Sequence, residues 1–191
     1  MGINCFEIIC YFYPEDTALR RLLLEHCGQV RDKALAILRN PAGDGLEIDA
    51  GLVADGAMLH DIGIGRCHAP GILCEGAEPY LRHGVIGAEM LRGYGRKYGL
   101  DLEACARICE RHTGTGITAE EIRMQKLPLP ERDYLPETPE EKLICLADKF
   151  YSKSGGRREK NVCRIRRSMM KFGADSVARL DGMCRMFGIQ E

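Results

Sequence analysis

Four of the five histidines in this chain fall within or at the ends of segments with helical periodicity. They are spread widely along the sequence, as His26, His60, His83 and His112. Imidazole nitrogens bind first-row transition metals well, above all when carboxylates complete the ligand set. A single histidine in a helix is more often structural than a metal ligand. The hypothesis of a metal site therefore rests on the ordered set of four histidines. The four histidines are candidate metal ligands from separate elements.

Two aspartates complete the candidate set. Asp61 directly follows His60, and Asp148 lies in an apolar helical run from Leu143 to Phe150. A carboxylate that faces a core is costly unless it is paired or bound to metal. Adjacent helix residues point about 100° apart, but at a helix end His60 and Asp61 can both turn toward one cation. The alternatives are a helix C-cap with a favourable histidine for His60-Asp61, and an arginine pair for Asp148.

Helices are expected to position these residues, because the sequence shows no convincing β alternation and no repeat period. We expect helices over residues 18–38, 49–61, 79–93, 101–112, 118–125 and 140–152, and two more between 155 and 191, divided near Gly173. The first segment is either one helix or two joined near Cys27-Gly28. Thr118 and Glu121 fit a capping box. The glycine- and proline-rich stretch 65–79 is expected to be a loop. The predicted fold class is all-α, a helical bundle.

Glycines stand beside two of the candidate ligand positions. Gly63 and Gly65 follow the His60-Asp61 pair and could let the chain leave the helix in a left-handed turn. Gly84 and Gly87 lie in the helix predicted around His83, where each glycine costs up to ~1 kcal/mol relative to alanine. We explain these two by the close approach of a neighbouring helix or a metal centre.

The composition is that of one ordinary folded domain. The chain has 191 residues, of which 45% are hydrophobic and 29% charged, and its net charge is -1. Such a charge provides no overall field that would gather nucleic acid or an anionic membrane, which favours a small substrate. The apolar start, Met1 to Tyr13, carries Glu7 and is too short to span a bilayer. We expect a cytoplasmic protein without a membrane segment, and a homodimer is compatible with the sequence.

The ten cysteines are expected to be free thiols. They are scattered through apolar helical positions without a CxxC pair. Cys105 and Cys109, one helical turn apart, could bind zinc, but buried small apolar residues are the more ordinary interpretation.

The order H…HD…H…H…D resembles the HD superfamily of metal-dependent phosphohydrolases, in the form with two extra histidines before the last aspartate. The strings HDIGIG, ERHTG and LADK carry the resemblance, which covers about Asp16 to Ser152. The stretch from Glu110 to Lys153 is similar to small HDIG-domain proteins of microbes. The resemblance implies a single HD domain over 1–191, with its core at about 16–152 and the helices of 155–191 packed on it.

The resemblance also implies one or two divalent transition-metal ions, as iron, manganese or zinc. The first would be held by His26, His60, Asp61 and Asp148. Asp61 would bridge to a second ion, which His83 and His112 would hold.

Cationic groups near these ligands are candidates for holding phosphate. The family often has a lysine where this chain has Ile64, and either Arg66 or Lys149 could replace it. Lys149 begins a basic run that continues with Lys153, Arg157, Arg158 and Lys160. A run of this kind is usually a solvated face, but Lys149 or Lys153 could bind phosphate, and Lys149 is the better candidate because it lies nearer Asp148. His68 is expected to be a surface loop residue rather than a proton donor for a leaving group.

The expected reaction is hydrolysis of a phosphate ester of a nucleotide or small phosphorylated metabolite by metal-activated water. Asp61 would accept a hydrogen bond from the hydroxide, and Arg66 or Lys149 would clamp the phosphate. The expected enzyme is therefore a phosphatase or phosphodiesterase whose partner is a small phosphorylated substrate and no nucleic acid. The alternatives are an HD-type di-iron oxygenase, which shares the six ligands, and a non-catalytic module that binds a phosphorylated ligand.

Overall fold

The computed structural model describes residues 3–39, 46–154 and 158–190, and helices dominate this part of the chain. The all-α fold class predicted from the sequence is confirmed. No helix in these ranges is long and apolar enough to cross a membrane. The α-helices are α1 (Cys5–Phe12), α2 (Ala18–Leu38), α3 (Ala50–Leu59), α4 (His83–Tyr98), α5 (Glu103–Arg111), α6 (Ala119–Gln125), α7 (Pro139–Lys149), α8 (Val162–Met169) and α9 (Ala174–Met186).

Local signals in the sequence explain where several helices begin. The Thr17 hydroxyl accepts a hydrogen bond from the Arg20 backbone N–H, and α2 then runs unbroken to Leu38 as one helix. The capping box predicted for Thr118 and Glu121 is present at the start of α6. Helix α7 begins with a second capping box and has Pro139 in its first turn, where the missing N–H costs nothing.

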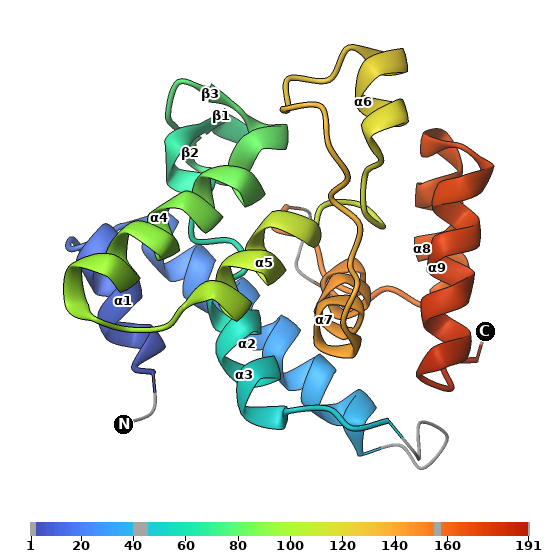
Figure 1. The fold of residues 1–191 in the computed structure, drawn as a ribbon, viewed down its shortest axis with the longest axis horizontal. Helices are drawn as coiled ribbons and strands as arrows, with labels where there is room; N and C mark the ends of the chain where they lie inside the picture. The colour runs from blue at the N-terminus through green and yellow to red at the C-terminus, as the bar shows by residue number, and fades with distance from the viewer. Residues whose placement is uncertain (1–2, 40–45, 155–157, 191) are drawn as a thin grey trace.

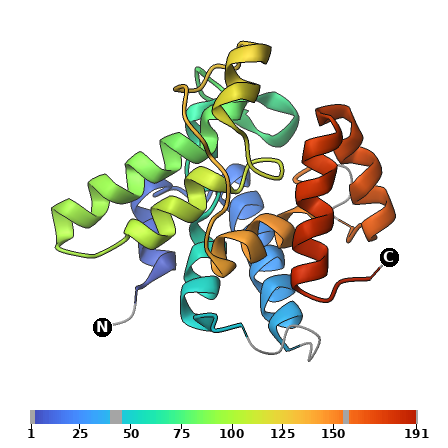
Figure 2. The ribbon, with the colours of Figure 1, turned by 45° about the vertical axis from the view of Figure 1, so that its right-hand side comes forward.

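The helices form pairs that surround the candidate ligands. Helices α2 and α3 pack together, as do α4 and α5, while α7 lies between these pairs and the C-terminal helices α8 and α9 (Figures 1 and 2). One buried apolar cluster extends from Val30 of α2 through Ile144 of α7 to Leu180 of α9. The C-terminal helices are thus packed on the body of the fold. The division at 16–152 stays a prediction, and residues 155–157 and 191 lie outside the described ranges.

A small sheet lies in the stretch expected to be a loop. It consists of β1 (Cys67–Ala69), β2 (Cys74–Glu75) and β3 (Glu78–Pro79), in the order β2-β1-β3. Strand β1 is antiparallel to β2, with Ala69 opposite Cys74, and parallel to β3. Strands of two or three residues are too short to show alternation, so the pattern in the sequence could not reveal them.

All ten cysteines are free, as predicted. Cys105 and Cys109 are buried in the apolar cluster that joins α1, α2, α4 and α5. The Cys109 thiol donates to the His60 carbonyl oxygen, with the sulfur 2.9 Å away. These two residues therefore contribute to packing.

The glycines near the ligands are required by close packing, and the left-handed turn expected at Gly63 was wrong. Gly63 has a right-handed conformation with φ -85°. A Cβ atom there would lie 2.2 Å from the His83 carbonyl oxygen. A Cβ on Gly84 would lie 2.4 Å from the Cys109 carbonyl oxygen, and one on Gly87 2.6 Å from the Cys109 sulfur. The close approach predicted for Gly84 and Gly87 is confirmed: α4 packs directly on α5 and on the turn after Asp61.

Two glycines of the same helix allow a matched test of this packing. Gly84→Ala should lower the free energy of unfolding by about 1–3 kcal/mol, because the added methyl group overlaps backbone atoms that cannot move aside easily. A Cβ on Gly93 meets nothing within 4 Å. Gly93→Ala should therefore raise stability by up to about 1 kcal/mol through helix propensity. Denaturant unfolding followed by circular dichroism measures both, and equal stabilities of the two variants would contradict the packing argument.

Candidate metal centre

The six predicted ligands meet in one buried cluster, although they come from five helices. His60 is the C-cap residue of α3, His83 the first residue of α4 and His112 the C-cap residue of α5. All six residues are at most 9% exposed: His26, His60, Asp61, His83, His112 and Asp148. Helix ends and turns thus supply most of the cluster, because a side chain at a helix end can point away from the helix body.

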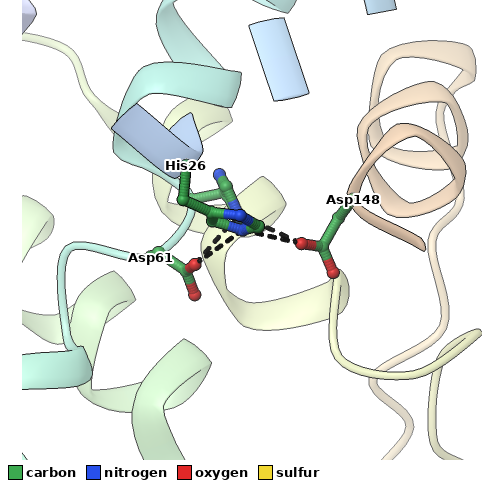
Figure 3. A group of neighbouring side chains, drawn as sticks. His26, Asp61 and Asp148 are labelled. Carbon is green, nitrogen blue, oxygen red and sulfur yellow. Dashed lines mark hydrogen bonds and ion pairs between the residues drawn. The ribbon is translucent and has the colours of Figure 1, made fainter. Parts of the chain in front are cut away.

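The first group of ligands surrounds the space between Asp61 and Asp148. His26 Nε2 lies 3.0 Å from Asp148 Oδ1 and 3.2 Å from Asp61 Oδ2, and Figure 3 shows its ring between these two carboxylates. His60 Nε2 lies 3.2 Å from the same Asp61 oxygen and 3.6 Å from Asp148 Oδ1. Ligand atoms about 2.1 Å from one tetrahedral ion lie about 3.4 Å apart, so these separations suit a shared ion.

The second group uses the other oxygen of Asp61. His83 Nε2 and His112 Nε2 lie 3.0 Å apart, and each is 3.5 Å from Asp61 Oδ1. One carboxylate oxygen of Asp61 therefore faces the first group and the other faces the second. This is the arrangement that a carboxylate bridging two ions requires.

Backbone carbonyl groups orient three of the imidazole rings in the same way. The Nδ1–H groups of His60, His83 and His112 donate to the carbonyl oxygens three residues earlier in the chain, each at 2.7 Å. This bond fixes the tautomer and leaves Nε2 directed at the centre, which is the usual support for a metal-bound histidine. His60 Nε2 and Asp61 Oδ1 are buried without a hydrogen-bond partner among the described residues. These atoms fit a transition metal.

Two lysines compensate the carboxylates. Lys153 Nζ lies 2.6 Å from Asp61 Oδ2, and Lys149 Nζ lies 2.6 Å from Asp148 Oδ2. Both side chains are nearly buried. The sequence favoured Lys149 as the nearer cation, and the structure places Lys153 at the centre as well. Sequence distance from Asp148 concealed this, because the chain turns back over the centre after α7.

Burial and the neighbouring charges set opposite protonation preferences within the cluster. Burial alone would raise the pKa of Asp61, but Lys153 and His60 hold it well below the usual range. Burial would lower the pKa of His60, but Asp61 raises it well above 6.5. Burial lowers the pKa of His83 to about 3, helped by the neighbouring His112. The surroundings thus favour the neutral form of His83, whereas they favour the protonated form of His60.

A cavity of about 390 Å³ opens over the first group of ligands. Its lining includes Asp148, Tyr80 and Lys153. The Tyr80 ring stacks on His83, with centroids 4.6 Å apart and planes at 15°. The sequence did not single out Tyr80. Tyr80 precedes His83 by three residues, and the carbonyl groups that support the two other imidazole rings also lie three residues before their histidines. A ligand in this cavity would meet the centre and both side chains.

Two other predicted residues lie outside this cavity. Arg66 is exposed and lines a separate cavity together with Phe12 and Thr17. His68 is exposed on β1. The assignment of Arg66 or Lys149 as a phosphate clamp stays a prediction, and Arg157 of the basic run lies outside the described residues.

The HD domain profile matches residues 23–152, which is most of this chain. The chain belongs to the HD domain family. The resemblance inferred from the order of histidines and aspartates is therefore confirmed, and the buried ligand cluster is the HD centre of this chain. No solved structure matches the chain at a significant level.

Three curated relatives show where this HD domain occurs. An uncharacterized protein of Methanocaldococcus jannaschii is 42% identical over 126 residues, which are 66% of this chain and 64% of the relative. A protein of Picrophilus torridus named tRNA (cytidine(56)-2'-O)-methyltransferase is 36% identical over 78% of this chain and 40% of its own length. A protein of Thermoplasma volcanium with the same name is 34% identical over 93% of this chain and 44% of its own length. The chain thus spans less than half of either methyltransferase.

These names contradict the prediction of a metal-dependent phosphohydrolase. The two relatives are named as methyltransferases, and neither is named as a phosphatase or phosphodiesterase. The physical reason for the error is that the ligand set selects a cation and not a reaction. A metal ion held by imidazole and carboxylate polarises whichever oxygen it binds.

Metal analysis of single variants can test the two ligand groups of the centre. We expect up to two transition-metal ions in the wild-type chain. Replacing His83 or His112 with alanine should reduce the content toward one, because the first group keeps its four ligands. Asp61→Ala should lower the occupancy of both positions, and His68→Ala serves as the exposed histidine control. Elemental analysis after loading with manganese, iron or zinc gives the counts. Full occupancy in the Asp61 variant would refute the bridge.

Metal uptake should also release a proton. The raised pKa of His60 favours its protonated form, and a ligand nitrogen must be neutral, so filling the first group should release about one proton. His83 is already neutral and should release none. A pH indicator in weak buffer measures the release during titration with zinc. Uptake without proton release in the wild-type chain would show that His60 is neutral beforehand.

Proposed function

We propose that this chain is a metal-dependent module of tRNA modification, whose HD centre binds an oxygen-bearing group of the RNA. The observation that carries this is the cavity over the ligands, in which an open face of the centre adjoins Lys153 and Tyr80. A metal ion there would bind the phosphate or hydroxyl oxygens that RNA offers. The names of the two methyltransferase relatives support RNA as the source of these oxygens.

A cluster of cations beside the cavity supports an anionic ligand. Lys160 donates hydrogen bonds to the carbonyl oxygens of Lys149 and Tyr151, which places it next to the end of α7. Burial lowers the pKa of Lys160, Asp148 opposes this effect, and the nearby cations Lys149 and Arg164 lower the pKa further. Side chains that repel one another in this way bind a shared anion favourably.

This proposal differs from the sequence-based expectation of a small substrate without nucleic acid. That expectation rested on the net charge of -1, which describes the whole chain. Phosphate binding depends on local charge, and the cations near Lys160 supply it even though the total is close to neutral. tRNA is therefore a ligand that the local charge permits.

We do not assign the methyl transfer itself to this chain. More than half of each methyltransferase lies outside the matched segment, so there is ample room in those proteins for the methyl-transfer machinery. The HD centre would hold the RNA, and the transfer would take place on another part of the protein or on a separate chain. The role proposed for this chain is binding and positioning of tRNA.

Binding of a tRNA transcript by the metal-loaded chain tests this function. Chelator treatment should weaken binding about tenfold or more, because a direct metal–oxygen contact contributes several kcal/mol. Lys160→Ala and Arg164→Ala should each reduce the slope of the logarithm of the binding constant against the logarithm of the salt concentration by about one. Arg123→Ala, an exposed cation on α6, is the matched control. Fluorescence anisotropy measures all four, and circular dichroism confirms that each protein is folded. Binding that ignores the chelator would overturn the proposal.

A further inference from the structure

A group of aromatic side chains, two exposed and two partly buried, lies at the end of the molecule away from α8 and α9. It joins Tyr11 and Phe12 of α1 to Tyr94 and Tyr98 of α4, and we call it the aromatic surface. Helix α1 crosses the far half of α4 at the left of Figures 1 and 2, while α8 and α9 lie at the right. Tyr11 is 45% exposed and Tyr98 is 48% exposed. Large apolar rings are seldom left open to water together without a binding role.

The rings hold one another in a fixed arrangement. The Tyr11 ring makes edge contacts with Tyr94 and Tyr98, at centroid distances of 5.0 and 5.8 Å. Tyr94 and Tyr98 are one helical turn apart and 4.4 Å apart between centroids. Because each ring is braced by its neighbours, little side-chain freedom is left to lose on binding. The aromatic surface is thus preorganised.

Cations are part of the same surface. Lys97 Nζ lies 3.0 Å from the Tyr11 hydroxyl and 4.9 and 5.0 Å from the ring centroids of Tyr11 and Tyr98. Arg96 beside it is exposed. Aromatic rings interleaved with exposed cations are the combination with which proteins bind single-stranded RNA, since the rings stack on bases and the cations contact phosphates.

A cavity continues from the aromatic surface through Phe12. The Phe12 ring contacts Tyr94 and also lines a cavity of about 390 Å³. Arg66 and Glu15 line this cavity as well. A carboxylate accepts hydrogen bonds from the amino group of a base, and a guanidinium donates to base or phosphate oxygens. The cavity thus offers both an acceptor and a donor group to a ligand that enters it.

The aromatic surface and the metal centre can be reached by one RNA molecule. Helix α4 begins at the ligand His83 and ends at Tyr98, so its axis separates them by about 22 Å. This distance corresponds to about six stacked nucleotides. The Tyr13 hydroxyl in the cavity wall donates to the Ile62 carbonyl oxygen and accepts from the Gly65 N–H, which ties the cavity to the turn after Asp61.

We propose that the aromatic surface and its cavity bind unpaired nucleotides of an RNA loop, with bases stacked on Tyr11 and Tyr98 and phosphates held by Lys97. This inference rests on the proposed function for its choice of RNA, but it concerns a site that the metal ligands do not touch. It makes the chain a reader of single-stranded RNA.

Binding of a labelled single-stranded RNA of about 12 nucleotides tests the site directly. Tyr11→Ala and Tyr98→Ala should each raise Kd by about 5- to 150-fold, the usual effect of removing an aromatic side chain on which one base stacks. Tyr98→Phe keeps the ring and should stay within about twofold. Phe172→Ala is the matched control, because Phe172 is also 48% exposed but precedes α9. The same strand annealed to its complement should bind more weakly.

Several outcomes would overturn the inference. Equal binding of single strand and duplex would do so, as would equal Kd values for Tyr98→Ala and Phe172→Ala. Metal-dependent binding of the tRNA transcript, measured in parallel, separates the two proposals. If Tyr98→Ala binds tRNA as the wild type does and still needs metal, only the aromatic surface is refuted. If binding of single-stranded RNA requires Tyr98 but binding of tRNA does not depend on metal, only the proposed function is refuted.

Discussion

The Asp61 carboxylate is entirely buried, and both of its oxygens face the centre of the helical bundle. Taking such a charge out of water costs several kcal/mol unless partners surround it closely. The partners come from every side: His60 from α3, His83 from the start of α4 and Lys153 from beyond α7. They can approach only because Gly63 and Gly84 let the backbones of neighbouring elements touch. The close packing of the helices and the geometry of the centre therefore depend on each other.

Sequence patterns predicted well what depends on local periodicity or on residue order. The capping box at Thr118 follows from neighbouring residues alone and is present, whereas periodicity gave the span of α2 but left open whether it was one helix or two joined near Cys27-Gly28. The six candidate ligands could be chosen because histidines and aspartates in this order on separate helices are rarely accidental, and the structure brings all six together. The part played by Gly63 was missed, since a contact with the distant His83 carbonyl group leaves no mark in nearby sequence. The same holds for Tyr80, whose stacking on His83 depends on how the chain enters α4.

The segment matched by the HD family includes only part of the aromatic surface. The HD profile covers 23–152 and includes all six ligands, but α1 lies before it. Tyr11 and Phe12 of the aromatic surface thus lie outside the matched segment, whereas Tyr94 and Tyr98 lie within it. The matched segment and α1 thus both contribute rings to the aromatic surface.

The ammonium groups of Lys149 and Lys153 have a consequence for how the protein folds. Each lies 2.6 Å from one of the two buried carboxylates, so the chain's own atoms offset the charge of Asp61 and Asp148. Small zinc domains, by contrast, rely on their ion to fold. In this chain the two lysines share that task, so folding depends less on a bound cation than it does in such domains.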